Sequence, residues 1–424
     1  MNSDFTAHRA KQAGSTNAEQ FCELPGLVLH INPGGLEHGG GIGRMIGYMI
    51  NAWEQRPQHP DMRVLDTRGA GHILMSPWYF ARCLLIIAAL TPRRPLLHVH
   101  VAGRGSTIRK IILVHFARAL RLPVVLHLHD YDYRQSLQRF PKFVQRLARS
   151  MFRISNRVVV LGDKDRDLVE TELGVSADRL SVIPNAVPAP PRTSDVAAND
   201  LAQVSAHVST HVSTHVSTHV LTHGPVQILF LGNPSRRKGV HDLIAALAER
   251  PLRDMNWHVT VAGGGDEIAT FREQAHASGL SDRVDFPGWV GRAETMALLD
   301  SADIVVLPSY AEGMAMSVLE GMSYGLCVVC TPVGSLQYVI ENEVTGLIVE
   351  PGNVGGLRDA LSRAVEDQGL RNRLGAEAAR VFASKFDAAS YPDRMRPIYV
   401  SAFGTTTGIP RCDKSGYGKS DASG

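Results

Sequence analysis

Short apolar runs, many of them rich in β-branched residues, alternate with longer amphipathic stretches along most of this chain. Such runs are typical of strands buried on both faces of a parallel sheet. Strands that alternate with helices predict an α/β fold built from doubly wound domains. The predicted strands cover 27–31, 96–101, 124–128, 158–161, 180–184, 226–231, 258–262, 284–286, 304–307 and 327–330. Helices are expected to cover 134–157, 241–249, 316–324 and 386–399. Three further helices are expected to end at residues 52, 121 and 300, and the one that ends at 121 follows a GRGST loop.

A change of composition separates the two halves of this pattern. From residue 188 to 222 the chain is dominated by Pro, Ala, Ser and Thr, with an HVST repeat beginning at His207, His211 and His215. Histidines four residues apart could bind a metal from one helix face, but Thr and Val are poor helix formers, which favours a linker. The predicted organisation is a disordered segment (1–25), a Rossmann-like domain (26–187), the linker (188–223), a second Rossmann-like domain (224–385), a helix returning toward the first domain (386–402) and a disordered tail (403–424).

The composition is that of an ordinary globular protein and adds few constraints. The 424 residues are 44% apolar and 20% charged, which suits two domains. No apolar run is long enough to cross a bilayer and the first residues lack the apolar core of a signal peptide, so we expect a cytoplasmic protein. Five cysteines make no disulfide framework, and Cys327 and Cys330 fall within an apolar strand, where packing is the favoured role.

Charge is distributed unevenly between the halves. Residues 1–200 carry 25 Lys and Arg against 17 Asp and Glu, a net +8, which leaves −5 for the remainder. Part of the excess lies on the predicted helix at 134–157, where basic and apolar residues are interleaved. A solvated basic face is the default interpretation, and a surface for anionic lipid or for an anionic acceptor is the functional one. No nucleic-acid-binding motif accompanies the charge.

Residues 303–334 combine the features of a ligand site. The strand at 304–307 is followed by a loop with Glu312 and by a helix with Glu320 in its first turn. In open α/β sheets ligands bind beyond the carboxyl ends of the strands, so residues 309–317 should line a pocket above a helix N-terminus, which favours an anion. The competing interpretation is a capping box, in which Glu320 pairs with Ser317 and only satisfies a backbone donor.

Other loops at predicted strand ends offer weaker candidates. Gly40 and Gly41 precede a helix and suit either a phosphate cradle or a structural turn, but they match neither a dinucleotide fingerprint nor a P-loop. His129 ends a strand and is placed for ligand contact, although a lone histidine is more often structural. We expect His127 to point to the opposite face.

Two charged clusters complete the candidates. Arg236, Arg237 and Lys238 precede a helix and form either a generic basic turn or an anion site. Asp130 and Asp132 have the spacing of a metal-binding pair, but the pattern of both halves is typical of a metal-independent two-domain architecture, so no metal site is expected.

Glu312 and Glu320, seven residues apart after the Pro308–Ser309 pair, resemble the signature of the retaining GT-B glycosyltransferases of family 4. The resemblance extends to Gly232 and the Lys238–Gly239 pair, and it is good over 226–399 and weak over 27–187. It implies the GT-B fold, two doubly wound Rossmann-like domains facing each other across a cleft, with an acceptor-binding N-terminal domain and a nucleotide-sugar-binding C-terminal domain.

The resemblance also implies roles for individual residues. Lys238 would contact the donor diphosphate; Asn233 stands where the family has an arginine, so Arg237, or failing that Arg236, would supply the second cation. Glu312 would bind the sugar hydroxyls and Glu320 the ribose. The remaining implied residues are the amides of Gly313, Met314, Ala315, Met316 and Ser317 at sugar and phosphate, Gly264 and Trp289 near the nucleotide, His129 near the reacting sugar, and Gly40 and Gly41 near the phosphates. The Gly313–Met314–Ala315 run departs from the family's usual Gly-Phe-Gly.

The implied activity is metal-independent hexosyl transfer with retention, from a nucleotide-sugar donor and without a cofactor. The acceptor would be a glycan or a polyprenyl-diphosphate-linked glycan of exopolysaccharide, capsule or lipopolysaccharide biosynthesis, with the basic first domain at the inner face of the membrane. Nucleic acid is not an expected partner. The alternatives are a nucleotide-sugar epimerase of the same fold and a non-catalytic protein that binds a nucleotide sugar.

Overall fold

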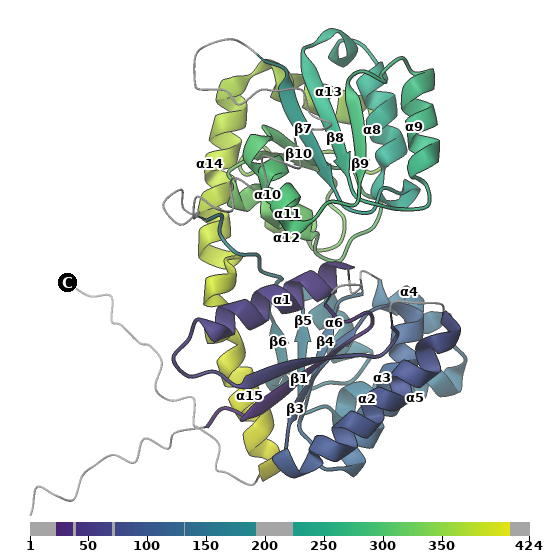
Figure 1. Cartoon of the computed structure of the whole chain (residues 1–424), viewed down its shortest axis with the longest axis vertical. Helices are drawn as coiled ribbons and strands as arrows, with labels where there is room; N and C mark the ends of the chain where they lie inside the picture. The colour runs from purple at the N-terminus through teal and green to yellow at the C-terminus, as the bar shows by residue number, and fades with distance from the viewer. Residues whose placement is uncertain (1–22, 37–39, 70–72, 131, 192–223, 408–424) are drawn as a thin grey trace, which may run out of the picture.

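The chain folds into two α/β lobes, one above the other in Figure 1. This computed structural model describes residues 23–36, 40–69, 73–130, 132–191 and 224–407. The predictions for 1–22, for most of the linker with its HVST repeat and for 408–424 therefore lie outside the described residues.

The N-terminal lobe contains a six-stranded parallel sheet in the order β2-β1-β3-β4-β5-β6. β1, β3 and β4 are buried throughout, as their continuous apolar character predicts. The strands are β1 (Leu27–Asn32), β2 (Asp61–Asp66), β3 (Leu96–Val101), β4 (Val124–Leu128), β5 (Arg157–Val160) and β6 (Leu180–Val182). The helices are α1 (Gly40–Glu54), α2 (Ser76–Leu90), α3 (Gly103–Ala119), α4 (Tyr133–Gln138), α5 (Lys142–Ile154) and α6 (Asp163–Thr171).

The C-terminal lobe repeats this architecture with the parallel order β12-β11-β10-β7-β8-β9. Its strands are β7 (Val226–Leu231), β8 (Trp257–Ala262), β9 (Val284–Gly288), β10 (Ile304–Leu307), β11 (Cys327–Cys330) and β12 (Leu347–Ile348). Its helices are α8 (Val240–Ala248), α9 (Ile268–Ala277), α10 (Arg292–Ser301), α11 (Met316–Ser323), α12 (Leu336–Val339), α13 (Val354–Glu366) and α14 (Gln368–Lys385). Cys327 and Cys330 are buried and free in β11, where packing is their role.

The last helices connect the lobes a second time. α14 runs from the upper lobe toward the lower one, and α15 (Tyr391–Thr407) lies against β3, β4 and β5 of the N-terminal sheet (Figure 1). Between them, Val187 and Ala388 pair through a backbone hydrogen bond of 2.9 Å. α15 continues to Thr407, so the predicted disordered tail from 403 is wrong for its first residues.

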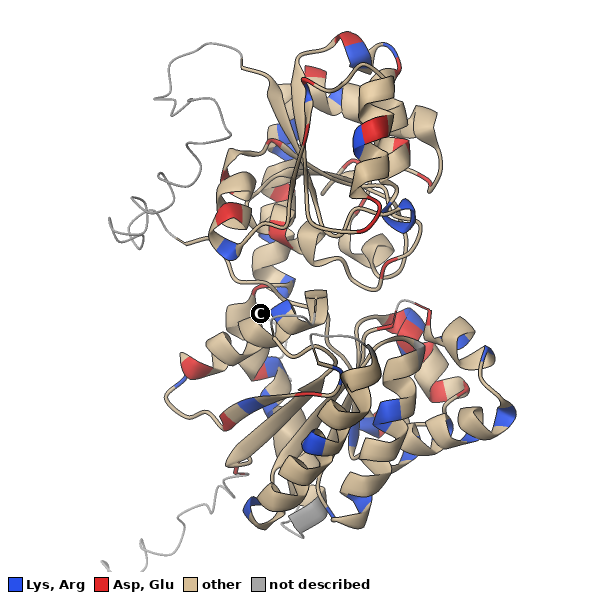
Figure 2. Cartoon of the chain, turned by 45° about the vertical axis from the view of Figure 1, so that its right-hand side comes forward, with Lys and Arg blue, Asp and Glu red and all other residues tan. Residues whose placement is uncertain are grey.

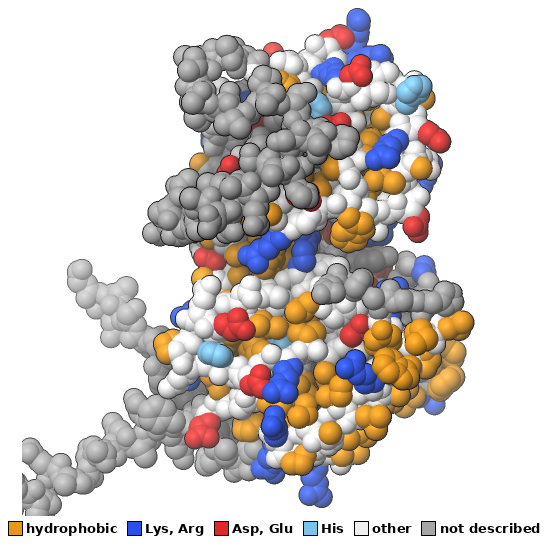
Figure 3. Space-filling model, viewed as in Figure 1, with side chains coloured by type: hydrophobic (Ala, Val, Ile, Leu, Met, Phe, Trp, Pro, Cys, Tyr) orange, Lys and Arg blue, Asp and Glu red, His pale blue; other side chains and the backbone are white. Residues whose placement is uncertain are grey.

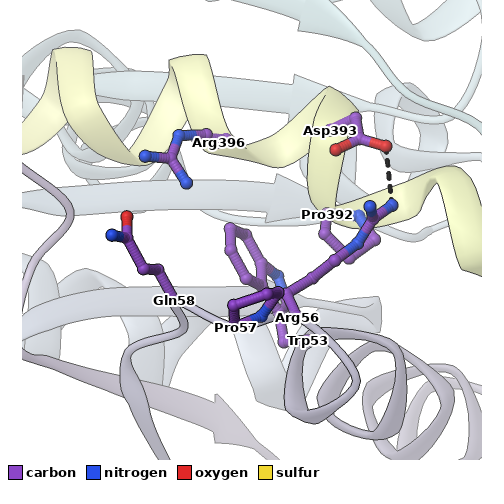
Figure 4. A pocket seen from close by; sticks show the side chains of 7 residues that line it. All are labelled: Trp53, Arg56, Pro57, Gln58, Pro392, Asp393 and Arg396. Carbon is purple, nitrogen blue, oxygen red and sulfur yellow. Dashed lines mark hydrogen bonds and ion pairs between the residues drawn. The ribbon is translucent and has the colours of Figure 1, made fainter.

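A shallow pocket of about 250 Å³ lies where α1 ends beside the start of α15 (Figure 4). Arg56 holds the two helices together there: its Nη2 lies 2.7 Å from Asp393 Oδ2 and 2.8 Å from the Ala389 carbonyl oxygen. The pocket sits at the far end of α1 from Gly41. It therefore belongs to the helix junction and not to the edge of the sheet where parallel strands end.

Two predicted elements need correction, and other elements were missed. The GRGST segment is not a loop, because α3 already begins at Gly103. The helix expected at 134–157 is two helices, since Pro141 lacks the N–H that would continue the first one. β2 and α2 were not predicted, and β2 is only partly buried, so its apolar signal is weak.

None of the helices within the described residues combines the length and the apolar character needed to span a membrane. α2 has the most apolar composition in the N-terminal lobe and covers only Ser76–Leu90.

Candidate active site

Lys238 and Glu312 meet at the carboxyl ends of neighbouring strands β7 and β10. Lys238 lies in a single helical turn after β7, and Glu312 lies in the loop after β10. Gly239 closes the turn with φ of 70°, and a Cβ there would lie 2.0 Å from the Pro308 carbonyl oxygen. Only glycine allows this approach, so the Lys238–Gly239 pair brings the two loops together.

Glu312 is 8% exposed and has three polar neighbours. Its Oε1 lies 2.8 Å from Lys238 Nζ, 2.9 Å from Ser309 Oγ and 3.7 Å from Arg237 Nη1. Arg237 also donates to the Ala311 carbonyl oxygen. Arg236 is exposed, and its backbone N–H donates to Glu267. Of the two candidate arginines, Arg237 is therefore the one that lies beside Glu312.

The N-terminus of α11 lies next to this cluster. Its N-cap is Ala315, which has no side chain that can accept from the first turn. The capping box considered for Ser317 and Glu320 is thus not formed, because the helix starts at Met316 and Ser317 is already inside it. The first N–H groups of α11 have no side-chain cap, which suits an anion at this position.

Glu320 instead faces the other lobe. Its Oε1 lies 3.2 Å from Arg44 Nη1 and accepts from the Tyr48 hydroxyl at 3.3 Å, and both partners belong to α1. Its Oε2 is buried without a partner among the described residues. Burial is the larger cause and the negative charge of Glu320 the next one, and together they raise the pKa of Tyr48 to about 12. This phenol therefore stays protonated and donates.

Arg44 and Tyr48 were not among the predicted site residues. They are four residues apart on a helix whose other inward positions are apolar, and they follow the glycine loop. That spacing places both side chains on one helix face and is the sequence signal that could have identified them.

The glycine loop and residues 313–317 also meet across the interface between the lobes. A Cβ built on Gly41 would lie 3.7 Å from Met316 Cγ, which places the start of α1, at Gly40, beside the start of α11. Asn185, after β6, donates from its backbone N–H to Met314 Sδ at 3.1 Å and from its Nδ2 to the Met314 carbonyl oxygen at 3.2 Å. Asn185 is a second residue that the prediction missed.

Gly264 and Trp289 come together at the ends of β8 and β9. A Cβ on Gly264 would lie 2.1 Å from Trp289 Cδ1, so the indole packs directly on the glycine, while Trp289 remains 81% exposed. Gly313, next to Glu312, accepts from the Ser335 backbone N–H at 2.8 Å. The predicted residues of the C-terminal lobe thus surround one strand edge, and Trp289 forms its exposed rim.

His129 does not stand alone at the end of β4. Its Nε2 lies 3.0 Å from His100 Nδ1, and its ring centroid lies 4.0 Å from that of His127. The expectation that His127 points to the opposite face is wrong, because residues two apart on a strand share a face. Burial lowers the pKa of His129 to about 3, so its imidazole is neutral.

The Asp130 and Asp132 carboxylates have structural partners. Asp130 accepts from the backbone N–H groups of Gly103 at 3.2 Å and Asp132 at 3.3 Å, and Asp132 caps α4 by accepting from the Gln135 N–H. These hydrogen bonds account for the Asp-x-Asp spacing at the β4–α4 turn.

The two halves of the chain match two family models. Residues 40–189 match the model described as Glycosyltransferase Family 4, and residues 214–381 match the one described as Glycosyl transferases group 1. Alpha-D-kanosaminyltransferase from Streptomyces kanamyceticus is 25% identical over 308 residues, which cover 71% of this chain and 76% of that protein.

A second relative is similar over a shorter stretch. The lipopolysaccharide core biosynthesis glycosyltransferase LpsE from Rhizobium meliloti is 29% identical over 174 residues, which cover 41% of this chain and 49% of that protein. The matched region is thus about half the length of that relative.

Among solved structures, sucrose-phosphate synthase from Thermosynechococcus elongatus superposes with a TM-score of 0.69 at 18% identity, covering 89% of this chain and 99% of that one. This likeness, together with the two parallel sheets, confirms the predicted GT-B fold.

Proposed function

Because the chain belongs to glycosyltransferase family 4, we propose that it is a retaining, metal-independent hexosyltransferase that uses a nucleotide-sugar donor. The proposed acceptor is a glycan or a polyprenyl-diphosphate-linked glycan in surface polysaccharide biosynthesis. The lipopolysaccharide role named for the relative LpsE agrees with this acceptor class.

One observation carries the proposal: Lys238, Arg237 and Glu312 converge beside the uncapped N-terminus of α11. Cleavage of a sugar–phosphate bond builds negative charge on the departing diphosphate and positive charge on the anomeric carbon. Two cations and oriented backbone N–H groups stabilise the first charge. A buried carboxylate within reach of the sugar stabilises the second and accepts hydrogen bonds from hydroxyl groups.

The proposed places of the remaining groups follow from this anchor. Glu320 binds the donor ribose, for which its unpartnered Oε2 is available, while Arg44 and Tyr48 hold Oε1. Trp289 lies at the exposed rim, where it can cover the nucleotide. Gly40, Gly41 and His129 belong to the N-terminal lobe and approach the phosphates and the sugar from the opposite side.

A donor and acceptor screen tests the proposal. Purified protein is incubated with labelled UDP-, GDP- and ADP-sugars, and the acceptors include polyprenyl-diphosphate-linked glycans and small amino-sugar acceptors. Transfer of label with retained anomeric configuration is expected for at least one pair. Isomerisation of a donor without an acceptor would identify an epimerase instead, and binding without any turnover would identify a sensor.

We also propose that the N-terminal lobe contacts an anionic membrane. Large apolar side chains gather on the lower lobe in Figure 3, over the region of α2, α3 and α5. Lys and Arg are distributed over the same helices in Figure 2. Arg82, Arg139, Lys142 and Arg146 are all exposed. The exposed apolar residues, between 43% and 78% accessible, are Leu74, Met75, Trp78, Leu85, Ile108, Ile112, Phe143 and Leu147.

The Phe143→Ser/Leu147→Ser variant is expected to lower binding to vesicles containing anionic lipid by about tenfold or more. Each large apolar side chain contributes about 1.5–3 kcal/mol when it is fully buried, and partial insertion gives a fraction of that. Co-sedimentation measures the change, with Val344→Ser in the other lobe as the matched control. Equal binding of both variants, or binding to neutral vesicles that salt does not weaken, would contradict the proposed contact.

A further inference from the structure

Five histidines gather on one face of the N-terminal sheet. His30 comes from β1, His98 and His100 from β3, and His127 and His129 from the end of β4. Strand register sets His30 beside His98 and His100 beside His127. The first four are fully buried, and His129, half-buried, ends the row at the carboxyl edge of the sheet.

Three of these rings form a chain that ends at His129, at the carboxyl edge of the N-terminal sheet. His30 Nδ1 lies 3.2 Å from His100 Nε2, and His100 Nδ1 lies 3.0 Å from His129 Nε2. Both contacts join an Nδ1 to an Nε2, so one nitrogen of each pair donates and the other accepts. Burial lowers the pKa of His30 and His129 to about 3 and that of His100 well below 6.5, so each ring is neutral and carries a single N–H.

The other two rings form a parallel chain that ends on α15. His127 Nδ1 lies 3.2 Å from His98 Nε2, and His98 Nδ1 lies 2.8 Å from the Tyr399 hydroxyl oxygen. The Tyr399 hydroxyl donates to Met49 Sδ at 3.6 Å. The direction of this chain is set by its inner end, at His127.

The histidine at the buried end of each chain, His30 or His127, determines which ring nitrogens carry the protons. His30 Nε2 and His127 Nε2 are buried and have no partner among the described residues. A buried N–H without an acceptor is rarer in proteins than a buried acceptor without a donor. The protons of His30 and His127 therefore lie on Nδ1, and in the first chain each ring donates outward to the next.

We propose that His30 and His100 are positioning residues that hold His129 in the tautomer with its proton on Nδ1. The Nε2 lone pair of His129 is then occupied by the N–H of His100. Among the described residues none forms a hydrogen bond with His129 Nδ1, so this N–H is the group that His129 offers to a ligand. It makes His129 a fixed hydrogen-bond donor to the sugar rather than an acid or base, a role that rests on the proposed function.

A metal ion is the competing occupant of the cluster. His30, His98 and His100 form one set that could hold an ion, and His100, His127 and His129 form another. Three nitrogens about 2.0–2.1 Å from a zinc ion would have lone pairs converging on one point. Instead, the contact between His100 and His129 has hydrogen-bond geometry, in which the N–H of one ring is directed at the lone pair of the other and the two lone pairs are not directed at a common ion. The geometry therefore favours the hydrogen-bonded chain.

Nitrogen NMR of protein labelled with ¹⁵N in histidine tests the proposal without any substrate, and the His129 signals are assigned by their loss in His129→Asn. The expected wild-type form is the Nδ1–H tautomer. His100→Leu should release His129 into a mixture of tautomers, whereas His100→Asn, which keeps a donor near the Nδ1 position, should preserve the wild-type form. Tyr399→Phe, in the other chain, is the matched control and should leave His129 unchanged.

Three outcomes would overturn the proposal. They are an Nε2–H tautomer in the wild type, an unchanged tautomer in His100→Leu, and cluster signals that shift when EDTA removes a bound ion. In a transfer assay, kcat should fall about tenfold in His100→Leu and recover in part in His100→Asn. The KM for the acceptor should be unchanged in both variants. Because the tautomer is read without substrate, a protein with no transferase activity would refute the proposed function and leave this result intact.

Discussion

Replacing Lys238 with alanine is expected to lower kcat/KM for sugar transfer by about 10²- to 10³-fold. A preorganised donor aimed at charge that develops in the transition state is worth a loss of that size when it is removed. The Lys238 side chain is only 13% exposed, and Gly239 and the Pro308 loop fix its position. Water that enters the variant therefore stabilises the developing negative charge less well than the ammonium group does. Steady-state kinetics with the donor found by screening would measure the change.

Nucleoside diphosphate binding separates this role from simple support of Glu312. Lys238→Ala should weaken binding of the diphosphate, whereas Glu312→Gln, which alters the group proposed to bind the sugar, should leave that binding close to wild type. Arg250 is exposed and paired with Asp254, so Arg250→Ala is the matched control for the loss of one cation from the same lobe. Diphosphate binding by Lys238→Ala at wild-type strength would show that Lys238 does not contact the donor.

Acid is expected to destabilise the protein steeply between pH 6.5 and pH 5. A histidine whose folded pKa lies below its unfolded value of 6.5 binds its proton only on unfolding, so its contribution is intact above pH 6.5 and declines as pH falls toward the folded pKa. For His30, with a pKa of about 3, the loss is about 1.4 kcal/mol per pH unit, or about 2 kcal/mol by pH 5. Four more histidines of the cluster act in the same direction.

Asp165 acts in the opposite direction in this pH range. Burial raises the pKa of Asp165 to about 6, so that group gains a proton on folding and offsets part of the acid loss. Urea unfolding at several pH values measures the sum, and His30→Leu should reduce the slope of unfolding free energy against pH by about 1.4 kcal/mol per unit. Tyr399→Phe removes a cluster contact but no group that titrates in this range, so its slope should equal that of the wild type. An unchanged slope in His30→Leu would contradict the expected titration.

The loops at the carboxyl ends of strands were the part of the site closest to prediction. Strands β10 and β11 have the predicted bounds, and the loop between β10 and α11 holds Glu312 beside the Lys238 turn. Local sequence suffices there, since apolar runs mark buried strands and parallel strands end at one edge. The capping box failed for a local reason as well: α11 begins at Met316, two residues earlier than the spacing of Ser317 and Glu320 requires.

The sequence by itself determined the α/β class, the two lobes and the identity of the charged loops, because these depend on periodicity and on residue types close together in the chain. Only the tertiary structure decided that Glu320 faces Arg44 and Tyr48, that Asn185 holds Met314, and that five histidines share one sheet face. Those contacts join residues far apart in sequence. They depend on strand order, register and the docking of one lobe on the other, which hydrophobic periodicity does not encode.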